Sequence, residues 1–331
     1  MMRIAVTTMS TDMPDEFLKQ LVQLGVDCLD YGNGACFAGV KEQGYPDLDV
    51  LLRHKRRIRS FGLDINRVTL PDMTEAFMKG LPGAEKELEN SVSAMKVFGE
   101  AGIPIARQRF AGDTFDHLYT SYTARLRGGY EVRGERARLE ARHDIPAQAE
   151  LEAWWERFCA VYGKLVPVAE DYNVKLSLHP SDVPHPETPF GGLGYHRVID
   201  AFPSKQVGYV YCIGTRGEAG GSSLVLDEIN HYGRKGRIHA VHIRNVRGSL
   251  PTAGAFEETL LDDGDMNMFR MLLELKKVGF TGCLNPDHIP VLIGDNPDWY
   301  KGGADVRCGM GLAYSVGYLK ALLCAAVEYG W

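Results

Sequence analysis

Short β-branched runs alternate with amphipathic helical patterns along this chain, and this alternation constrains its fold more than any other feature. In the first unit, "RIAVTT" at 3–8 is followed by "DEFLKQLVQLG" at 15–25, where apolar residues recur at helical spacing and Gly25 ends the helix. Strands are predicted at 3–8, 26–32, 63–70, 103–110, 174–180, 207–215, 238–245 and 281–288. Eight strands that alternate with helices predict a (β/α)8 TIM barrel, a fold of the α/β class.

A doubly wound open sheet is the competing architecture, because it also alternates strands and helices. Against it, no G-x-G-x-x-G motif follows the first strand and no G-x-x-x-x-G-K-[ST] motif occurs. The 331 residues exceed the roughly 250 typical of a TIM barrel, and a polar segment rich in Arg and Gly, 111–148, follows the fourth strand. We predict a single TIM-barrel domain over 1–331, with 111–148 as an enlarged loop that forms an insertion or a lid.

The composition narrows the classes of partner. A hydrophobic content of 45% and a formal net charge of -6, without a basic stripe, give no basis for nucleic-acid binding. No signal-peptide pattern and no apolar run of membrane-spanning length stands out, so a cytoplasmic enzyme is expected. The seven cysteines lack the close pairs of a zinc ribbon or a disulfide scaffold, which indicates reduced and mostly buried thiols.

The fifth to eighth predicted strands each end in a residue that can bind a metal. These residues are His179 in "LSLHPSD", Cys212 in "YVYCIGT", His242 in "AVHIRN" and Asp287 in "LNPDH". Because the carboxyl ends of barrel strands meet at one open face, the four side chains are expected to lie together. Nitrogen and sulfur ligands favour one divalent transition metal over magnesium or calcium, and leave zinc, manganese, iron and cobalt open.

Each of these residues also has an ordinary structural interpretation. His179 could bond to the backbone at a strand end, Cys212 could pack in the core, and Asp287 could be a turn residue. His239 precedes His242 by three positions, so the strand register decides which of the two faces the barrel mouth. The coincidence of four such residues at neighbouring strand ends is what favours a metal site.

Several motifs together resemble the mannonate dehydratase family. They are "LSLHPSDVP", "YCIGTRGE", "VHIRN", "FEETLLDDGDMNM", "NPDH" and "GLAYSVGYLKAL", in this order. The resemblance is strong over 174–331, weaker over 1–110 and poor over 111–148. It implies a TIM-barrel hydro-lyase that converts D-mannonate to 2-keto-3-deoxy-D-gluconate in hexuronate catabolism, with one divalent ion, usually Mn²⁺; Fe²⁺, Co²⁺ and Zn²⁺ are alternatives.

The resemblance also implies roles for particular residues. The metal ligands of the family match His179, Cys212, His242 and Asp287, and its acid/base pair matches His288 and Tyr314. Tyr314 could instead belong to the packing face of the last helix. Arg216 and Arg244 lie just beyond two ligand-bearing strands and are candidates to hold the substrate carboxylate. The expected partner is a small sugar acid, and barrels of this kind often form homo-oligomers.

Departures from the family pattern keep other functions open. The aromatic substrate-binding segment that follows the fourth strand in the family has no clear counterpart in "AGDTFDHLYTSYTARLRGGY", and "DHIP" replaces the usual small residue after the His. A different sugar acid is therefore a possible substrate. The alternatives are a sugar isomerase or epimerase on a metal-binding TIM barrel, against which Cys212 counts, and a non-catalytic sugar-acid-binding barrel.

Overall fold

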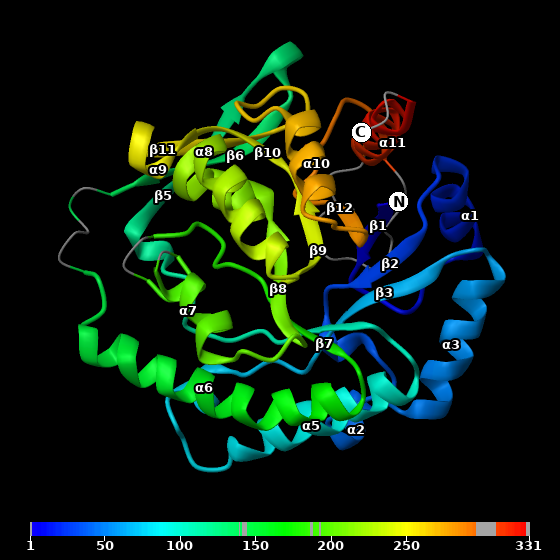
Figure 1. The fold of residues 1–331 in the computed structure, drawn as a ribbon, viewed down its shortest axis with the longest axis vertical. Helices are drawn as coiled ribbons and strands as arrows, with labels where there is room; N and C mark the ends of the chain where they lie inside the picture. Colours follow the sequence, from blue (N-terminus) through cyan, green and yellow to red (C-terminus); the bar gives the residue numbers. More distant parts are fainter. Residues whose placement is uncertain are drawn as a thin grey trace.

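A closed barrel of eight parallel strands forms the centre of the molecule (Figure 1), so the predicted TIM barrel is confirmed. The computed structural model describes residues 2–138, 140, 144–185, 188–191, 193–295 and 309–328. The barrel strands are β1 (Arg3–Thr8), β2 (Cys28–Tyr31), β3 (Asp64–Thr69), β4 (Ile105–Arg107), β7 (Lys175–Leu178), β8 (Val207–Cys212), β9 (Ile238–Ile243) and β12 (Cys283–Pro286). Their order around the barrel is β1-β12-β9-β8-β7-β4-β3-β2.

Helices form the outer layer around these strands (Figure 1). The longer ones are α1 (Asp15–Leu24), α3 (Leu48–Ser60), α5 (Glu85–Glu100), α6 (Gln148–Asp171), α7 (Leu193–Ala201), α8 (Ile213–Arg234), α10 (Met268–Lys277) and α11 (Met310–Glu328). One-turn helices are α2 (Val40–Gln43), α4 (Glu75–Met78) and α9 (Leu250–Ala253). Gly25 ends α1 in the left-handed conformation, with φ 84°, and donates its N–H back to the last turn, as predicted for a C′ glycine.

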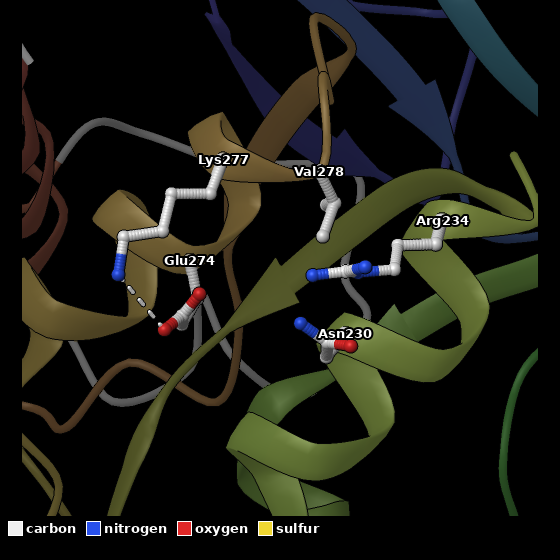
Figure 2. Close-up of a pocket in the computed structure, with 5 residues that line it drawn as sticks. All are labelled: Asn230, Arg234, Glu274, Lys277 and Val278. Atoms are coloured by element: carbon white, nitrogen blue, oxygen red, sulfur yellow. Dashed lines mark hydrogen bonds and ion pairs between the residues drawn. The ribbon is translucent and has the colours of Figure 1, made fainter.

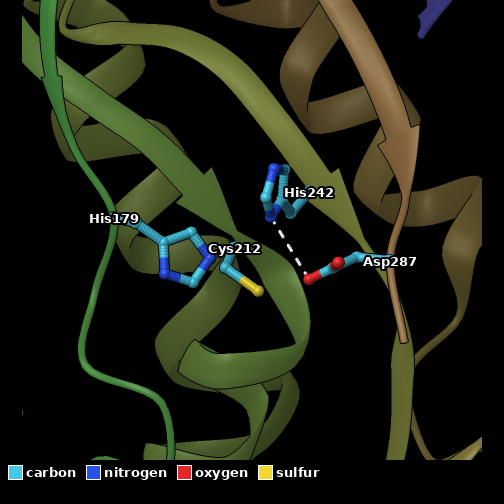
Figure 3. Close-up of side chains that lie close together, drawn as sticks. All are labelled: His179, Cys212, His242 and Asp287. Atoms are coloured by element: carbon cyan, nitrogen blue, oxygen red, sulfur yellow. Dashed lines mark ion pairs between the residues drawn. The ribbon is translucent and has the colours of Figure 1, made fainter. Parts of the chain in front are cut away.

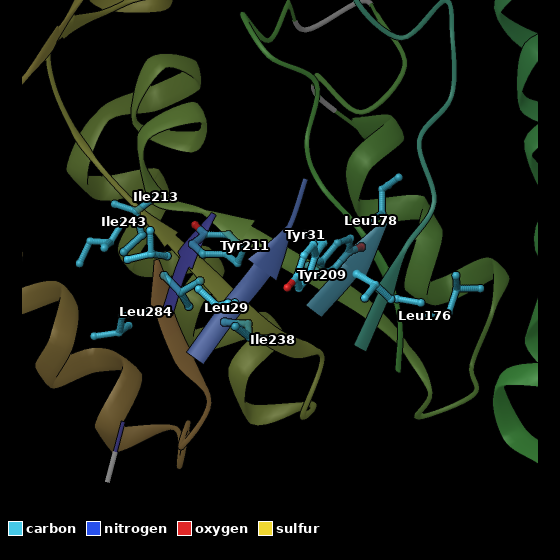
Figure 4. Close-up of a cluster of buried hydrophobic side chains, with 14 of the residues drawn as sticks. Leu29, Tyr31, Leu176, Leu178, Tyr209, Tyr211, Ile213, Ile238, Ile243 and Leu284 are labelled. Carbon is cyan, nitrogen blue, oxygen red and sulfur yellow. The ribbon is translucent and has the colours of Figure 1, made fainter. Parts of the chain in front are cut away.

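The alternation of side chains along each strand separates the core from the barrel interior. On β8, Tyr209 and Tyr211 point outward and donate hydrogen bonds to Tyr195 O on α7 and to Glu228 on α8. Figure 4 shows both tyrosines within the cluster of buried apolar side chains. Cys212 follows Tyr211 and faces the opposite side, because successive side chains of a strand alternate. The main core therefore lies between strands and helices, whereas polar side chains occupy the barrel mouth.

A second, antiparallel sheet was not anticipated. Its order is β10-β11-β6-β5, with β5 (Tyr119–Arg125), β6 (Glu131–Ala137), β10 (Asn245–Ser249) and β11 (Ala255–Thr259). The hairpin of β5 and β6 lies within the polar segment 111–148, and the hairpin of β10 and β11 follows β9 after the single residue Arg244. Both hairpins leave the carboxyl ends of barrel strands, so this sheet adjoins the barrel mouth.

Seven of the eight predicted strands are shorter in the structure, and two of these differences affect the site. The strand predicted at 207–215 ends at Cys212, because α8 begins at Ile213 and the Cys212 sulfur caps its first turn. The strand predicted at 103–110 is only Ile105–Arg107. The carboxyl end of β4 therefore lies at Arg107, three residues before the predicted end.

The expectation that the chain lacks an apolar run of membrane-spanning length was wrong for α11. Over the described residues, it is the one helix with the length and mean hydropathy, 1.5, of a candidate span. Leu312, Val316 and Leu319 are nevertheless buried in the main core, and α11 packs on α1, α10 and β12. These contacts are those of a barrel helix, which passes the same length and composition test.

Candidate metal centre and active site

The carboxyl ends of β7, β8, β9 and β12 bring together the four predicted metal ligands (Figure 3). His179 follows β7, Cys212 ends β8, His242 lies near the end of β9, and Asp287 follows β12. One potential ligand atom of each residue lies within 4.8 Å of the others. The register pairs Cys212 with His242, which selects His242 over His239 for the mouth.

The two histidines are neutral, which is the state in which an imidazole can bind a metal ion. The His179 Nδ1 contacts Pro180 O at 2.7 Å, which holds the proton there, and its Nε2 is buried without a hydrogen-bond partner. The His242 Nδ1 lies 3.2 Å from Asp287 Oδ2. Burial is the main cause that lowers the pKa of both imidazoles, so they are neutral near pH 7. The lone pair of the buried His179 Nε2 is therefore available to a cation.

The thiol and the carboxylate complete a set of donors that fits a divalent metal ion. The Cys212 sulfur accepts hydrogen bonds from Thr215 N at 3.4 Å and Thr215 Oγ1 at 3.2 Å, at the first turn of α8. Burial raises the pKa of the Cys212 thiol, and a bound cation would favour the thiolate. Burial opposes ionisation of Asp287, but His288 and His242 hold its pKa well below the usual range. Two nitrogens, a sulfur and an oxygen suit a transition metal.

His288 lies immediately after this cluster, and a third of its side chain is exposed. Its backbone has φ 44°, a left-handed conformation that a residue other than glycine rarely adopts and that is common at functional sites. The ring Nδ1 lies 2.5 Å from Glu258 Oε1 on β11. Burial alone would lower the pKa of His288, but the Asp287 and Glu258 carboxylates raise it to about 9.

Arg244, a predicted substrate-binding residue, lies beside the cluster but is already engaged. Its Nε is 4.0 Å from Asp287 Oδ2, and its Nη2 donates to Thr215 Oγ1 at 2.8 Å. The guanidinium is also paired with Glu218, which is fully buried, and lies 3.3 Å from Glu258. Arg244 is therefore surrounded by carboxylates of the protein, and its contact with Asp287 helps to hold the cluster in place.

Arg216, the other predicted substrate-binding residue, lies outside the cluster. Its Nε and Nη2 donate to the two Glu228 oxygens at 2.9 and 2.7 Å, and its Nη1 donates to Gly191 O at 3.0 Å. The side chain is 2% exposed. The first turn of α8 directs it back toward the helix rather than into the mouth, so a substrate carboxylate would have to displace a buried ion pair.

Tyr314 lies on the exposed side of α11. Tyr314 is 37% exposed, and its hydroxyl lies beside Asp262 and Arg127. Burial and Asp262 raise the pKa of its phenol. Within the part of the chain that the structure describes, no contact joins Tyr314 to His288 or to the four cluster residues.

Arg107, the last residue of β4, also lies at the end of a barrel strand but was not predicted as a site residue. Its Nε is buried without a hydrogen-bond partner, and no described carboxylate pairs with its guanidinium. Burial is the main cause that lowers the pKa of Arg107 to about 10, and its charge in turn lowers the pKa of His179. Arg107 lies within "IPIARQRF", and a correct strand end would have identified it as a site residue, but the strand was predicted to end at Phe110.

A separate pocket between α8 and α10 is not part of this site (Figure 2). It has a volume of about 550 Å³ and is lined by Asn230, Arg234, Glu274, Lys277 and Val278. Its lining lies toward the carboxyl ends of both helices, which lead into the starts of the next strands. The pocket is therefore at the end of the barrel opposite the cluster.

The fold and the side-chain cluster define a TIM barrel with a candidate divalent-metal site at its mouth. The family model for D-mannonate dehydratase (UxuA) matches residues 107–328, so the chain belongs to the D-mannonate dehydratase family and is a hydro-lyase. This match does not favour the isomerase or epimerase alternative.

Known proteins agree with this assignment. Mannonate dehydratase 2 of Halalkalibacterium halodurans is 24% identical over 275 residues, which cover 74% of this chain and 79% of that protein. Mannonate dehydratase of Thermotoga petrophila is 22% identical over 75% of this chain and 79% of its own length. Mannonate dehydratase of Streptococcus suis serotype 2 has a similar structure, with a TM-score of 0.81, 19% identity and coverage of 100% and 96% of the two chains.

Proposed function

We propose that this chain removes water from D-mannonate and forms 2-keto-3-deoxy-D-gluconate. The observation that carries the proposal is the convergence of His179, Cys212, His242 and Asp287 at the barrel mouth, in a chain of the D-mannonate dehydratase family. The reaction removes the weakly acidic proton beside the carboxylate and expels the neighbouring hydroxyl, and the resulting enol becomes the ketone. It therefore needs stabilisation of negative charge and a group that transfers protons.

These four residues would hold one divalent ion, for which we propose Mn²⁺, with Fe²⁺, Co²⁺ and Zn²⁺ as alternatives. Such an ion would supply Lewis-acid stabilisation of the negative charge that develops beside the substrate carboxylate. We assign the acid–base role to His288, because it adjoins the cluster and its ring is partly exposed at the mouth. We do not assign Tyr314 as the acid–base partner of His288, because Tyr314 lies beside Asp262 and Arg127 and no described contact joins it to His288.

We propose that Arg107 holds the substrate carboxylate in place of Arg216 and Arg244. Arg107 ends β4, which neighbours β7 in the barrel, and its guanidinium has no described carboxylate partner. A guanidinium without an ion-pair partner at the mouth is suited to a bidentate contact with a carboxylate. Arg216 and Arg244, by contrast, already pair with carboxylates of the protein.

Arg107→Met is expected to raise KM for D-mannonate by about 10- to 100-fold, because a hydrogen bond to a charged group contributes about 1.5–3 kcal/mol. The change in kcat should be smaller. Arg109→Met is the matched control, since Arg109 is 43% exposed and faces Asp72 at 3.7 Å. Steady-state kinetics measure both variants, and an unchanged KM in Arg107→Met would exclude the assignment.

Turnover of sugar acids by the purified, metal-loaded protein tests the proposed function. D-mannonate is expected to yield a 2-keto-3-deoxy acid, detected by its carbonyl group and by the mass of one lost water. The sequence after β4 differs from the family pattern in the segment that resembles its substrate-binding region. A panel of aldonic acids therefore tests whether another sugar acid is the preferred substrate. Ketose formation without water loss would instead indicate an isomerase, and binding without turnover a sugar-acid-binding protein.

We also propose that the protein acts in the cytoplasm as a homo-oligomer, without nucleic-acid or membrane partners. The cysteines that the structure describes are free thiols, in keeping with a reducing compartment. Met310 and Tyr314, four residues apart on α11, are both exposed and offer apolar surface for contact between subunits. Light scattering of the purified protein measures the oligomeric state.

A further inference from the structure

The second sheet reaches the candidate active site through Glu258 on β11. This side chain is 9% exposed, and one of its oxygens, Oε1, contacts three partners. His288 Nδ1 lies at 2.5 Å, Arg133 Nη2 at 2.8 Å and Arg244 Nη1 at 3.3 Å. Arg133 belongs to β6 and Glu258 to β11, so each hairpin of the second sheet contributes one side chain to this set of contacts.

The neighbouring residue Glu257 shows that this contact depends on one face of the sheet. Side chains alternate along β11, and Glu257 accepts a hydrogen bond from Tyr122 OH at 3.3 Å. The register pairs Glu257 with Gly134, next to Arg133. The sheet therefore directs Glu258 toward the barrel mouth and Glu257 away from it.

The contact with Glu258 determines which nitrogen of His288 can exchange a proton. The carboxylate can only accept, so Nδ1 keeps its proton in the hydrogen bond, and Nε2 is the nitrogen left for proton transfer. The left-handed backbone at His288, with φ 44°, is unfavourable for a residue that has a β-carbon. The contact between the ring Nδ1 and Glu258 helps to offset this cost and fixes the orientation of the ring. Arg133 and Arg244 in turn hold the Glu258 carboxylate.

We propose that Glu258 is a positioning residue for the dehydration, which orients the His288 ring and keeps the Nδ1 proton in place. The inference rests on the proposed function, in which His288 transfers a proton. It makes the second sheet, including the hairpin of β5 and β6, a structural part of the active site. Glu258 does not touch the reacting atoms and acts through His288.

Two substitutions of Glu258 separate orientation from charge balance. Glu258→Ala removes the acceptor, and kcat is expected to fall about 100-fold with KM within about 3-fold and metal content unchanged. Glu258→Gln keeps an acceptor oxygen, because Arg133 and Arg244 donate to Oε1 and would fix the amide carbonyl there. Its kcat is expected to stay within about 10-fold of the unsubstituted protein. Glu257→Ala is the matched control on the other face and should change kcat by less than about 2-fold.

Proton NMR of the zinc-loaded protein tests the positioning without depending on turnover. A downfield, slowly exchanging ring N–H resonance is expected, which disappears in His288→Asn and in Glu258→Ala and persists in Glu258→Gln. Absence of this resonance from the unsubstituted protein would overturn the inference, as would a Glu258→Gln variant that keeps the resonance but loses as much kcat as Glu258→Ala. If Glu258→Ala does not fold, the resonance of the unsubstituted protein and the kcat and resonance of Glu258→Gln still test the inference. A protein with the resonance but no turnover of D-mannonate would refute the proposed function alone.

Discussion

His179→Ala and Cys212→Ser are each expected to abolish the stable binding of a divalent ion. In the proposed site, the potential ligand atoms of four residues lie within 4.8 Å of one another, and each substitution removes one of these four donors. Elemental analysis should then find less than about one tenth of an equivalent of metal per chain, since even the loss of a supporting partner weakens metal affinity 10- to 100-fold. Dehydration should slow by about 1000-fold, because Lewis-acid stabilisation contributes several kcal/mol.

Cys324→Ser is the matched control for this experiment. Cys324 is exposed on α11, far along the chain from the cluster, and its replacement should leave both metal content and activity unchanged. Circular dichroism checks that the ligand variants remain folded, which matters because His179 and Cys212 are buried. Full metal content in both ligand variants would show that the ion, if any, binds elsewhere.

His288→Asn is expected to lower kcat by about 100- to 10,000-fold, the usual contribution of a general acid or base. Metal content should remain near that of the unsubstituted protein, because Asn at 288 leaves Asp287 and the other three ligands in place. Asparagine can also adopt a left-handed backbone such as the φ of 44° at this position. Steady-state kinetics and elemental analysis on the same preparation separate loss of proton transfer from loss of metal.

His231→Asn provides the comparison for this second variant. His231 lies on α8 and contacts Lys235 at 3.1 Å, at the end of the barrel opposite the cluster. The His231→Asn variant should retain the kcat of the unsubstituted protein. A kcat within about 3-fold of normal in His288→Asn would remove His288 from the acid–base role, whatever the metal content.

The candidate metal site could be predicted because it depends on topology more than on fine geometry. His179, Cys212, His242 and Asp287 end strands that are neighbours in the barrel, and all carboxyl ends of parallel strands meet at one face. Small errors in strand length did not matter for these four. Only the choice of His242 over His239 needed the register, in which His242 pairs with Cys212 and His239 instead bonds to Ser177.

Residues just beyond a strand end could not be placed in the same way. Arg216 follows Cys212 by four positions, yet the helix that begins at Ile213 turns it toward Glu228. Arg107 was hidden within a strand whose carboxyl end was predicted three residues too far along the chain. A difference of one residue rotates a side chain by about 100° on a helix and to the opposite face on a strand, so the direction of these arginines depends on where each element begins.

The sequence by itself determined the barrel, the family and the residues that converge at the barrel mouth, because strand and helix periods and strand order are local or topological properties. Only the tertiary structure decided which charges are already paired and which are not. Glu258 and His288 are 30 residues apart and meet at 2.5 Å through a sheet assembled from two loops. Such contacts depend on how distant segments pack, and no local pattern of residues encodes their distances.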